Sequence, residues 1–403
     1  MAPPAQDGHE GATGPLKIVS VRPVRAGQFL YARVETACGL VGWGESGAWG
    51  HLEASAAALS KFAEYLVGED PRRVELHWNV MQRFAHFSGH AVNGAVSAVD
   101  IALWDVLGQS LRAPVHALLG GAIRREARVY GHAYAPTADA IVADVRRLRE
   151  AGFGAVGHIN PFLDADEGDP AYGEAQVAKL RGAAAVVGRF REAAGEGMDV
   201  LLECHRRLDP AEALRFARLV EAHEPMWLED PLRPEYVAAT GDLARRSPVP
   251  VATGERFTSF VEFERQLAAG PVAYARVSTC VVGGITGARR AAAVAEAHGA
   301  RLAPHNPLSP VGLAACLHVA ACAPNFAILE YPTGFAGLRM LSTGELLGAH
   351  LVDAPPRAEG GYVAVSDRPG LGVAVDEAAA LAEAVVTRPV SMRRHRDGSP
   401  VDQ

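Results

Sequence analysis

Eight short apolar runs recur along the chain from about residue 128, and each ends in a chemically reactive side chain. These side chains are His132, His158, Glu203, Glu229, Glu255, Ser278, His305 and Glu330. Subtracting successive residue numbers gives spacings of 26, 45, 26, 26, 23, 27 and 25. One strand, one helix and two short loops need about 25 residues. The repeat therefore predicts a parallel β/α barrel, with all eight side chains gathered at the mouth formed by the C-terminal strand ends.

The stretches between the apolar runs have the pattern of amphipathic helices. Examples are TADAIVADVRRLREAG, DPAEALRFARLVEAH and ITGARRAAAVAEAHG, which open with or near a Thr or Asp that can cap a helix. The one long spacing contains the Gly, Asp and Pro-rich sequence LDADEGDPAYGE, which we interpret as an insertion. Strands and helices thus alternate through the second half of the chain.

The N-terminal part has a different order of elements. The strand-like sequences KIVSVRPVRA and FLYARVETACGLVGWGES are separated by a turn at Ala26-Gly27-Gln28. Two helical stretches follow, HLEASAAALSKFAEYLVG and NGAVSAVDIALWDVLGQSL. Strands followed by a run of helices indicate a separate α+β unit.

Composition narrows the class of protein. A formal net charge of −7 argues against a nucleic-acid or anionic-membrane partner. We expect no membrane span, because no apolar run approaches the roughly 18 residues required. Residues 1–14 lack the basic start and apolar core of a signal peptide, which favours a disordered leader on a cytoplasmic protein. Five cysteines with no CxxC pair are typical of buried thiols in a reducing compartment.

Three of the strand-end residues, Glu203, Glu229 and Glu255, stand on consecutive strands. A single glutamate there could be a solvated loop residue or a helix cap. Three carboxylates brought close together repel one another unless a cation lies between them. Oxygen ligands alone favour a hard ion, so we predict one Mg²⁺ per subunit.

Four segments resemble one family. They are SAVDIALWDVLGQSLRAPVHALLGG, LLECHRRLDPAEALRFARLVEAHEPMWLEDPLRPE, PVATGERF and GGITGARRAAAVAEAHGARLAPHNPLSPVGLAACLHVA. Together they resemble the mandelate racemase group of the enolase superfamily, especially its acid-sugar dehydratases, from about Leu16 to about Gly370. The resemblance implies a modified (β/α)7β TIM-like barrel under an α+β capping domain that the C-terminal tail completes. The expected divisions are a leader at 1–14, the cap at 15–127, the barrel at 128–350 and a segment at 351–403 that returns to the cap.

The resemblance also implies roles for the strand-end residues. It makes Glu203, Glu229 and Glu255 the Mg²⁺ ligands, with Glu203 where aspartate is more usual. His205 matches the histidine that protonates the departing hydroxide in the dehydratases. His305 matches the seventh-strand base, whose usual aspartate partner is replaced by Ser278.

The second strand end departs from the family pattern at one position, and the eighth strand end matches it. His158 stands where the family has a lysine, so either His158 or His305 could be the base. Asn160 fits the second position of that motif and is a candidate substrate ligand. Glu330 matches the eighth-strand glutamate that hydrogen-bonds the substrate carboxylate, a role that requires Glu330 to be protonated or to share a proton.

Other candidate substrate-binding residues lie in the loops around the predicted mouth. Trp49 and His51 are on a cap loop, and Arg207 and Arg256 follow two of the glutamates. Surface or packing roles are equally consistent with their positions.

The function predicted from these residues is Mg²⁺-dependent abstraction of the proton alpha to a carboxylate, with loss of water from a sugar acid. One alternative is a racemase, epimerase or cycloisomerase acting on a similar small carboxylate. The other is a non-catalytic binding descendant, because the usual lysine and aspartate are missing. We also expect a homo-oligomer.

Overall fold

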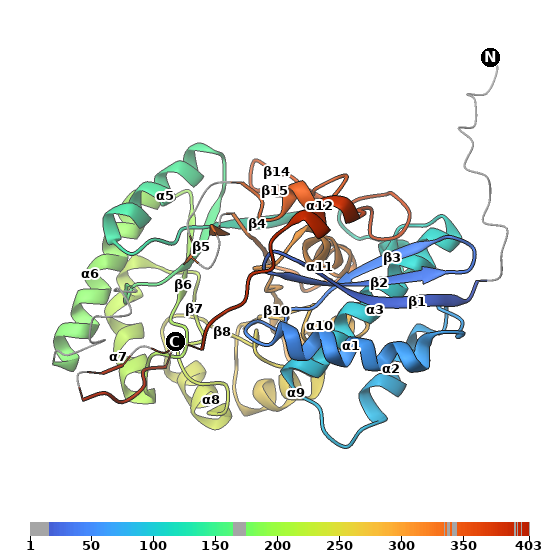
Figure 1. Ribbon diagram of the computed structural model, residues 1–403. Coiled ribbons are helices and arrows are strands. Elements are labelled where there is room, and N and C mark those ends of the chain that lie inside the picture. Colours follow the sequence, from blue (N-terminus) through green and yellow to red (C-terminus); the bar gives the residue numbers. More distant parts are fainter. Residues whose placement is uncertain are drawn as a thin grey trace, which may run out of the picture.

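The computed structural model describes residues 16–163, 175–333, 335–336, 339–340, 345–390, 392, 394–395 and 397–402. A small α+β cap and a larger parallel barrel lie side by side (Figure 1). The predicted leader and most of the predicted insertion LDADEGDPAYGE lie outside the described residues.

The cap is a three-stranded antiparallel sheet packed against helices. Its strands are β1 (Ile18–Ala26), β2 (Phe29–Thr36) and β3 (Val41–Glu45), in that order. Ala26 pairs with Phe29, so the turn between them falls where the sequence predicts it. The cap helices are α1 (Leu52–Leu66), α2 (Val74–Arg83), α3 (His90–Leu111) and the short α4 (Val115–Leu118).

Two glycines let α3 lie directly against β3. A Cβ atom on Gly42 would stand 2.2 Å from the carbonyl oxygen of Ala102, and one on Gly44 would stand 1.9 Å from that of Ala98. Any side chain at either position would push the helix off the sheet. The GWGE sequence therefore allows α3 to approach β3 closely.

Helix α3 contradicts the expectation that no apolar run is long enough to span a membrane. Among the described residues it is the one helix that meets that length and composition. Most of α3 is buried inside the protein, however, and Asp100 and Asp105 lie among its buried residues. A fully enclosed core helix has the same all-round apolar pattern.

The barrel contains eight parallel strands. They are β4 (Glu126–His132), β5 (Ala155–Ile159), β6 (Asp199–Glu203), β7 (Trp227–Glu229), β8 (Val251–Thr253), β9 (Tyr274–Ala275), β10 (Arg301–Leu302) and β11 (Leu329–Tyr331). Adjacent strands pair in sequence order from β4 to β10, and β11 pairs with β4. A parallel bridge between Leu302 and Phe326 joins β10 to the chain entering β11 and closes the ring.

Within the described residues, seven α-helices connect these strands, which confirms the predicted (β/α)7β order. They are α5 (Ala138–Glu150), α6 (Gln176–Ala194), α7 (Pro210–Val220), α8 (Val237–Arg246), α9 (Phe260–Ala269), α10 (Gly284–Ala297) and α11 (Pro310–Cys322). A short helix, η1 (Glu221–His223), follows α7. The α7 helix begins with a capping box between Asp209 and Glu212, as its DPAE sequence suggests.

The C-terminal segment contacts both domains. After β12 (Phe335–Ala336), β13 (Arg339–Met340) and η2 (Ala349–Leu351), the hairpin of β14 (Ala358–Glu359) and β15 (Tyr362–Ala364) pairs antiparallel with β4 of the barrel. Helix α12 (Glu377–Ala382) then lies on the cap, where Glu377 pairs with Arg22 and Arg33.

Residues beyond α12 cross from the cap back to the barrel (Figure 1). The guanidinium of Arg388 lies 3.9 Å from the centre of the Trp49 ring in the cap. Farther along, Val401 is buried, and the Asp402 carboxylate lies 3.8 Å from the Arg233 guanidinium after β7. The final described residues are therefore anchored at both domains.

Candidate active site

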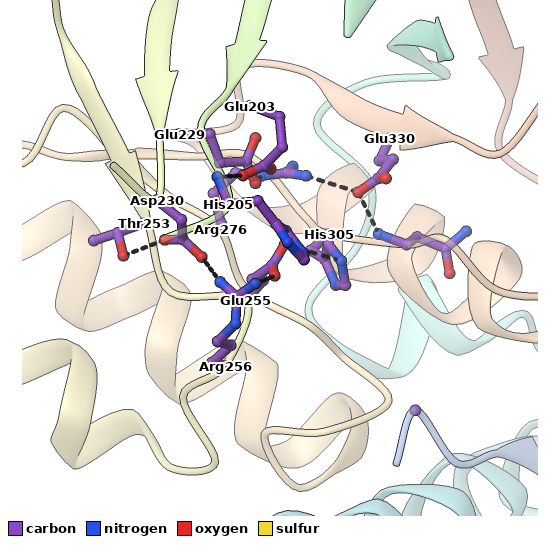
Figure 2. Close-up of polar contacts among 12 residues, drawn as sticks. Glu203, His205, Glu229, Asp230, Thr253, Glu255, Arg256, Arg276, His305 and Glu330 are labelled. Atoms are coloured by element: carbon purple, nitrogen blue, oxygen red, sulfur yellow. Dashed lines mark hydrogen bonds and ion pairs between the residues drawn. The ribbon is translucent and has the colours of Figure 1, made fainter. Parts of the chain in front are cut away.

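Glu203, Glu229 and Glu255 meet at the barrel mouth, at or just beyond the ends of β6, β7 and β8 (Figure 2). Parallel pairing puts Glu203 directly beside Glu229. One carboxylate oxygen from each residue lies within 4.8 Å of the other two. This is the convergence that the strand spacing predicts.

The three carboxylates fit a hard cation. Burial and the negative charges of Glu229 and Glu255 raise the pKa of Glu203 well above its usual value. Burial raises the pKa of Glu229 to about 8, even though the Arg276 guanidinium opposes the rise. Such a cluster is costly to ionise by itself, and a divalent ion among the oxygens would relieve the repulsion.

Arg256 and Asp230 support the third carboxylate. Arg256 donates to Asp230 and pairs with Glu255 at 2.9 Å. Thr253 donates a further hydrogen bond to Asp230 at 2.5 Å. Burial raises the pKa of Glu255, but the charges of Arg256 and the nearby histidines outweigh it and lower the value to about 2. Arg256, predicted to bind substrate, is thus already engaged with two carboxylates.

His205 lies immediately beyond Glu203. Its backbone N–H donates to a Glu203 carboxylate oxygen at 2.6 Å, which fixes the turn after β6. Burial and the charge of Arg256 lower the pKa of His205 well below its usual value. The protonated form of His205 is therefore a stronger acid than an ordinary imidazolium, and its neutral form is favoured.

His305 contacts the same cluster from β10. Its Nε2 lies 3.2 Å from a Glu255 oxygen, and its backbone forms a parallel bridge with Ser278, which follows the adjacent strand β9. Burial lowers the pKa of His305, although Glu255 and Glu330 act in the opposite direction. Neither His305 Nδ1 nor Ser278 Oγ has a hydrogen-bond partner within the described part of the chain.

His158 belongs to an aromatic group on the other side of the mouth. Its ring stacks on His132 with 5.1 Å between centres, and Tyr134 lies 5.6 Å away. Burial, and then the neighbouring His132, lower the pKa of His158 to about 4. His158 is therefore neutral at pH 7 and could accept a proton, but only as a weak base.

Glu330 is buried among hydrogen-bond donors at the end of the eighth barrel strand. One oxygen accepts from His132 Nε2 at 2.8 Å, and the other from Arg276 Nη2 at 2.7 Å and the Asn306 N–H at 3.0 Å. Burial alone would raise the pKa of Glu330, but the charges of His305, Arg276 and His132 hold it well below its usual value. These contacts favour the ionised form of Glu330, whereas hydrogen bonding to a substrate carboxylate would require Glu330 to carry or share a proton.

The sequence interpretation missed Arg276. This buried residue bonds Glu229, Glu330, the Tyr130 hydroxyl and the carbonyl oxygens of residues 303 and 304. It stands one residue past β9 and two before Ser278, so alternation directs it to the barrel interior. A charged residue inside the otherwise apolar run YARVSTC was the available signal.

Of the remaining predicted substrate-binding residues, two lie in the barrel and two in the cap. Asn160 is buried, and its side-chain oxygen accepts from the Phe162 N–H at 2.9 Å, which serves the local turn. Arg207 is buried after β6. Trp49 packs under Arg388, and His51 is exposed at the start of α1. The structure thus brings neither Trp49 nor His51 into contact with the three glutamates.

Backbone strain concentrates at the mouth. Positive φ angles occur at His158 (55°), His205 (51°), Arg206 (66°) and Asp230 (37°). Non-glycine residues rarely adopt this region unless surrounding structure enforces it. Four of the seven such non-glycine residues in the described part of the chain thus lie near the end of β5 or just after β6 and β7, at the edge that carries the three glutamates.

Comparison with known families agrees with this geometry. The model for the mandelate racemase / muconate lactonizing enzyme N-terminal domain matches residues 8–120, and the enolase C-terminal domain-like model matches residues 140–379. The chain therefore belongs to the enolase superfamily, in the mandelate racemase / muconate lactonizing enzyme family.

Individual relatives narrow the class further. The chain is 35% identical to a D-galactonate dehydratase of Verminephrobacter eiseniae over 88% of its own length and 90% of the relative's. It is 33% identical to a D-galactonate dehydratase of Cronobacter sakazakii, over 92% and 96% of the two chains. An enolase structure from Agrobacterium radiobacter, with sodium and L-malate bound, has a TM-score of 0.87 and 30% identity, and covers 96% of this chain and 100% of that one.

These findings confirm the resemblance to acid-sugar dehydratases of the mandelate racemase subgroup. The chain is accordingly a carbon–oxygen lyase. The alternative of a non-catalytic binding descendant finds no support among these relatives.

Proposed function

We propose that this enzyme removes water from a polyhydroxy acid in a Mg²⁺-dependent reaction and produces a 2-keto-3-deoxy acid. The observation that carries the proposal is the convergence of three carboxylates within 4.8 Å, with His205 and His305 beside them. D-Galactonate is the first substrate to test, because the curated relatives named above are D-galactonate dehydratases.

Glu203, Glu229 and Glu255 would hold the metal. Mg²⁺ bound there supplies positive charge beside the substrate carboxylate, which makes the α-proton more acidic. Arg256 and Arg276 keep Glu255 and Glu229 oriented through the ion pairs described above. Both arginines therefore hold the side chains of proposed metal ligands in place.

The histidines move the protons. His305 is held neutral by its burial and can accept the α-proton at Nε2. The electron pair released from carbon 2 forms a double bond to carbon 3 as the carbon–oxygen bond breaks. His205, whose low pKa means that it must first take up a proton, gives that proton to the leaving hydroxide, and the enol product tautomerises to the keto acid.

His158 provides a second possible base. It comes from β5, whereas His305 comes from β10, and two bases on different sides of a substrate permit transfer of a proton from one face to the other. An epimerase would use this arrangement without breaking the carbon–oxygen bond. The two functions differ in whether deuterium exchange is accompanied by loss of water.

The test is NMR of aldonic and aldaric acids, D-galactonate first, incubated with enzyme and Mg²⁺ in D₂O. A dehydratase gives a 2-keto-3-deoxy acid with deuterium at carbon 3. Exchange at carbon 2 without elimination would replace the proposal with an epimerase. No reaction with any acid would contradict both.

Variants assign the histidines in the same assay. His205→Asn should stop elimination and still allow exchange at carbon 2, because the base remains. His305→Asn should stop both. Exchange that survives in His305→Asn and is lost in His158→Asn would move the base to β5.

A further inference from the structure

We propose that Glu45, a cap residue with no contact to the three glutamates, is a positioning residue for His305. This inference rests on the proposed function, in which His305 accepts the α-proton. It assigns to the cap a role in holding the segment from His305 to Ser309 in place.

Glu45 ends β3 and is completely buried against the start of α11. One oxygen accepts from the Ser309 N–H at 3.1 Å, and the other from the Ser309 hydroxyl at 2.6 Å and the Gly312 N–H at 2.9 Å. The carboxylate thus satisfies backbone donors of the first turn of a 13-residue helix. The contact joins the cap to the barrel helix that directly follows the His305 segment.

The other end of the segment is fixed by the barrel. The His305 N–H donates to the carbonyl oxygen of Val277 at 3.1 Å, and the Asn306 N–H donates to Glu330 at 3.0 Å. Only two residues, 307 and 308, separate these bonds from the Glu45 contact at Ser309. The position of His305 therefore depends on one anchor in the barrel and one in the cap.

Packing around Gly312 leaves this segment little freedom. A Cβ atom there would lie 2.9 Å from the Asn306 side-chain oxygen and 3.0 Å from a Glu45 oxygen. The first turn of α11 thus fits between Glu45 and Asn306 only because residue 312 is glycine. A shift of Glu45 would be transmitted to Asn306 and hence to its neighbour His305.

Asp100 provides a matched control in the same cap. It is also completely buried, and its Oδ2 accepts from the Thr286 N–H at 2.9 Å, near the start of barrel helix α10. It therefore makes the same kind of bond between cap and barrel, but to a helix that does not follow His305. Loss of either carboxylate should disturb the domain contact, and only loss of Glu45 should disturb His305.

The experiment compares Glu45→Gln with Asp100→Asn in the full chain with Mg²⁺, using the acid that the wild-type enzyme dehydrates. We expect Glu45→Gln to lower kcat roughly 10- to 100-fold, since a small misplacement of a reacting group has effects of this size. KM should change less than about twofold, because the substrate-binding groups are elsewhere. Asp100→Asn should retain the wild-type kcat and KM.

Amide hydrogen exchange of the peptide covering residues 305–313 gives a readout independent of activity. Exchange there should accelerate in Glu45→Gln and stay unchanged in Asp100→Asn. Ser309→Ala, which removes only the hydroxyl donor, should show a smaller change of the same sign and replaces Glu45→Gln if that variant does not fold.

Two negative results can be told apart. Unchanged kcat and unchanged exchange at 305–313 in Glu45→Gln, with an active wild type, would overturn the role of Glu45. A wild type inactive on every acid, with faster exchange in Glu45→Gln, would instead overturn the proposed function and with it the positioning role.

Discussion

Asp100→Asn should make the stability of this protein less dependent on pH between pH 5 and pH 8. The Asp100 side chain is buried in α3, where only Oδ2 has hydrogen-bond donors and Oδ1 has no partner in the described part of the chain. Burial, reinforced by the nearby charge of Glu75, raises the pKa of Asp100 to about 7. Asparagine has nearly the same shape and carries no charge at any pH.

The size of the effect follows from this pKa. An aspartate in the unfolded chain titrates near pH 3.9, so between pH 5 and 7 only the folded state holds the Asp100 proton. The contribution of Asp100 to the free energy of unfolding is fully present below its pKa in the unfolded chain. It is lost as the pH rises from that value through the pKa of Asp100 in the folded protein. Two pH units at about 1.4 kcal/mol each give a loss of about 3 kcal/mol by pH 8.

The assay is urea unfolding of both proteins at pH 5, 6, 7 and 8. For each protein the free energy of unfolding is plotted against pH, and the Asp100→Asn curve is subtracted from the wild-type curve. The difference gives the contribution of Asp100, because Glu45 (pKa about 7) and Asp105 (pKa about 6) titrate in both proteins. The free energy of unfolding of the wild type, relative to Asp100→Asn, should fall by about 3 kcal/mol across this range. Asp242→Asn, at an exposed carboxylate, controls for loss of a charge. Parallel curves for wild type and Asp100→Asn would refute the reasoning.

Three further predictions concern the metal, the barrel interior and the C-terminal segment. Glu229→Gln should weaken Mg²⁺ binding in calorimetry and abolish turnover while the circular dichroism spectrum is retained; unchanged affinity would contradict the ligand assignment. Arg276→Met should lower the free energy of unfolding by about 3–5 kcal/mol, because it leaves Glu330 buried without its cation, and the added change Glu330→Gln should recover part of the loss. Equal stability of the single and double variants in urea would rule out that pairing. Val401→Asp should release the end of the chain to limited proteolysis, whereas Val390→Asp should not, since Val401 is buried and Val390 fully exposed; equal cleavage of the two variants would show that Val401 does not anchor the segment.

The fold and the carboxylate cluster were predictable because they depend on short-range periodicity. A strand buried on both faces must be apolar until it leaves the barrel, so a polar residue marks its C-terminal end. Once the strands are parallel and adjacent, Glu203 and Glu229 must be neighbours, as their pairing shows. No knowledge of distant contacts is needed for either step.

The protonation and partners of the site residues were not predictable in this way. Glu330 matches a ligand of the substrate carboxylate by its position alone, but its contacts with Arg276 and His132, which lower its pKa, cannot be found in the local sequence. The local sequence left both a substrate-binding and a packing role open for Trp49, and only the structure shows that Arg388 lies over its ring. Each outcome depends on a second residue that the local sequence does not identify.

The sequence by itself thus determined the parallel barrel, a separate α+β unit and the place of the three glutamates, because each follows from the spacing of residues along one element or between successive ones. Tertiary structure alone decided which residues support the site. His132 reaches Glu330 across 198 residues, and Glu45 reaches Ser309 across 264. Such pairs form only when the barrel closes and the cap docks on it, and the charges that set a buried pKa come into range only then.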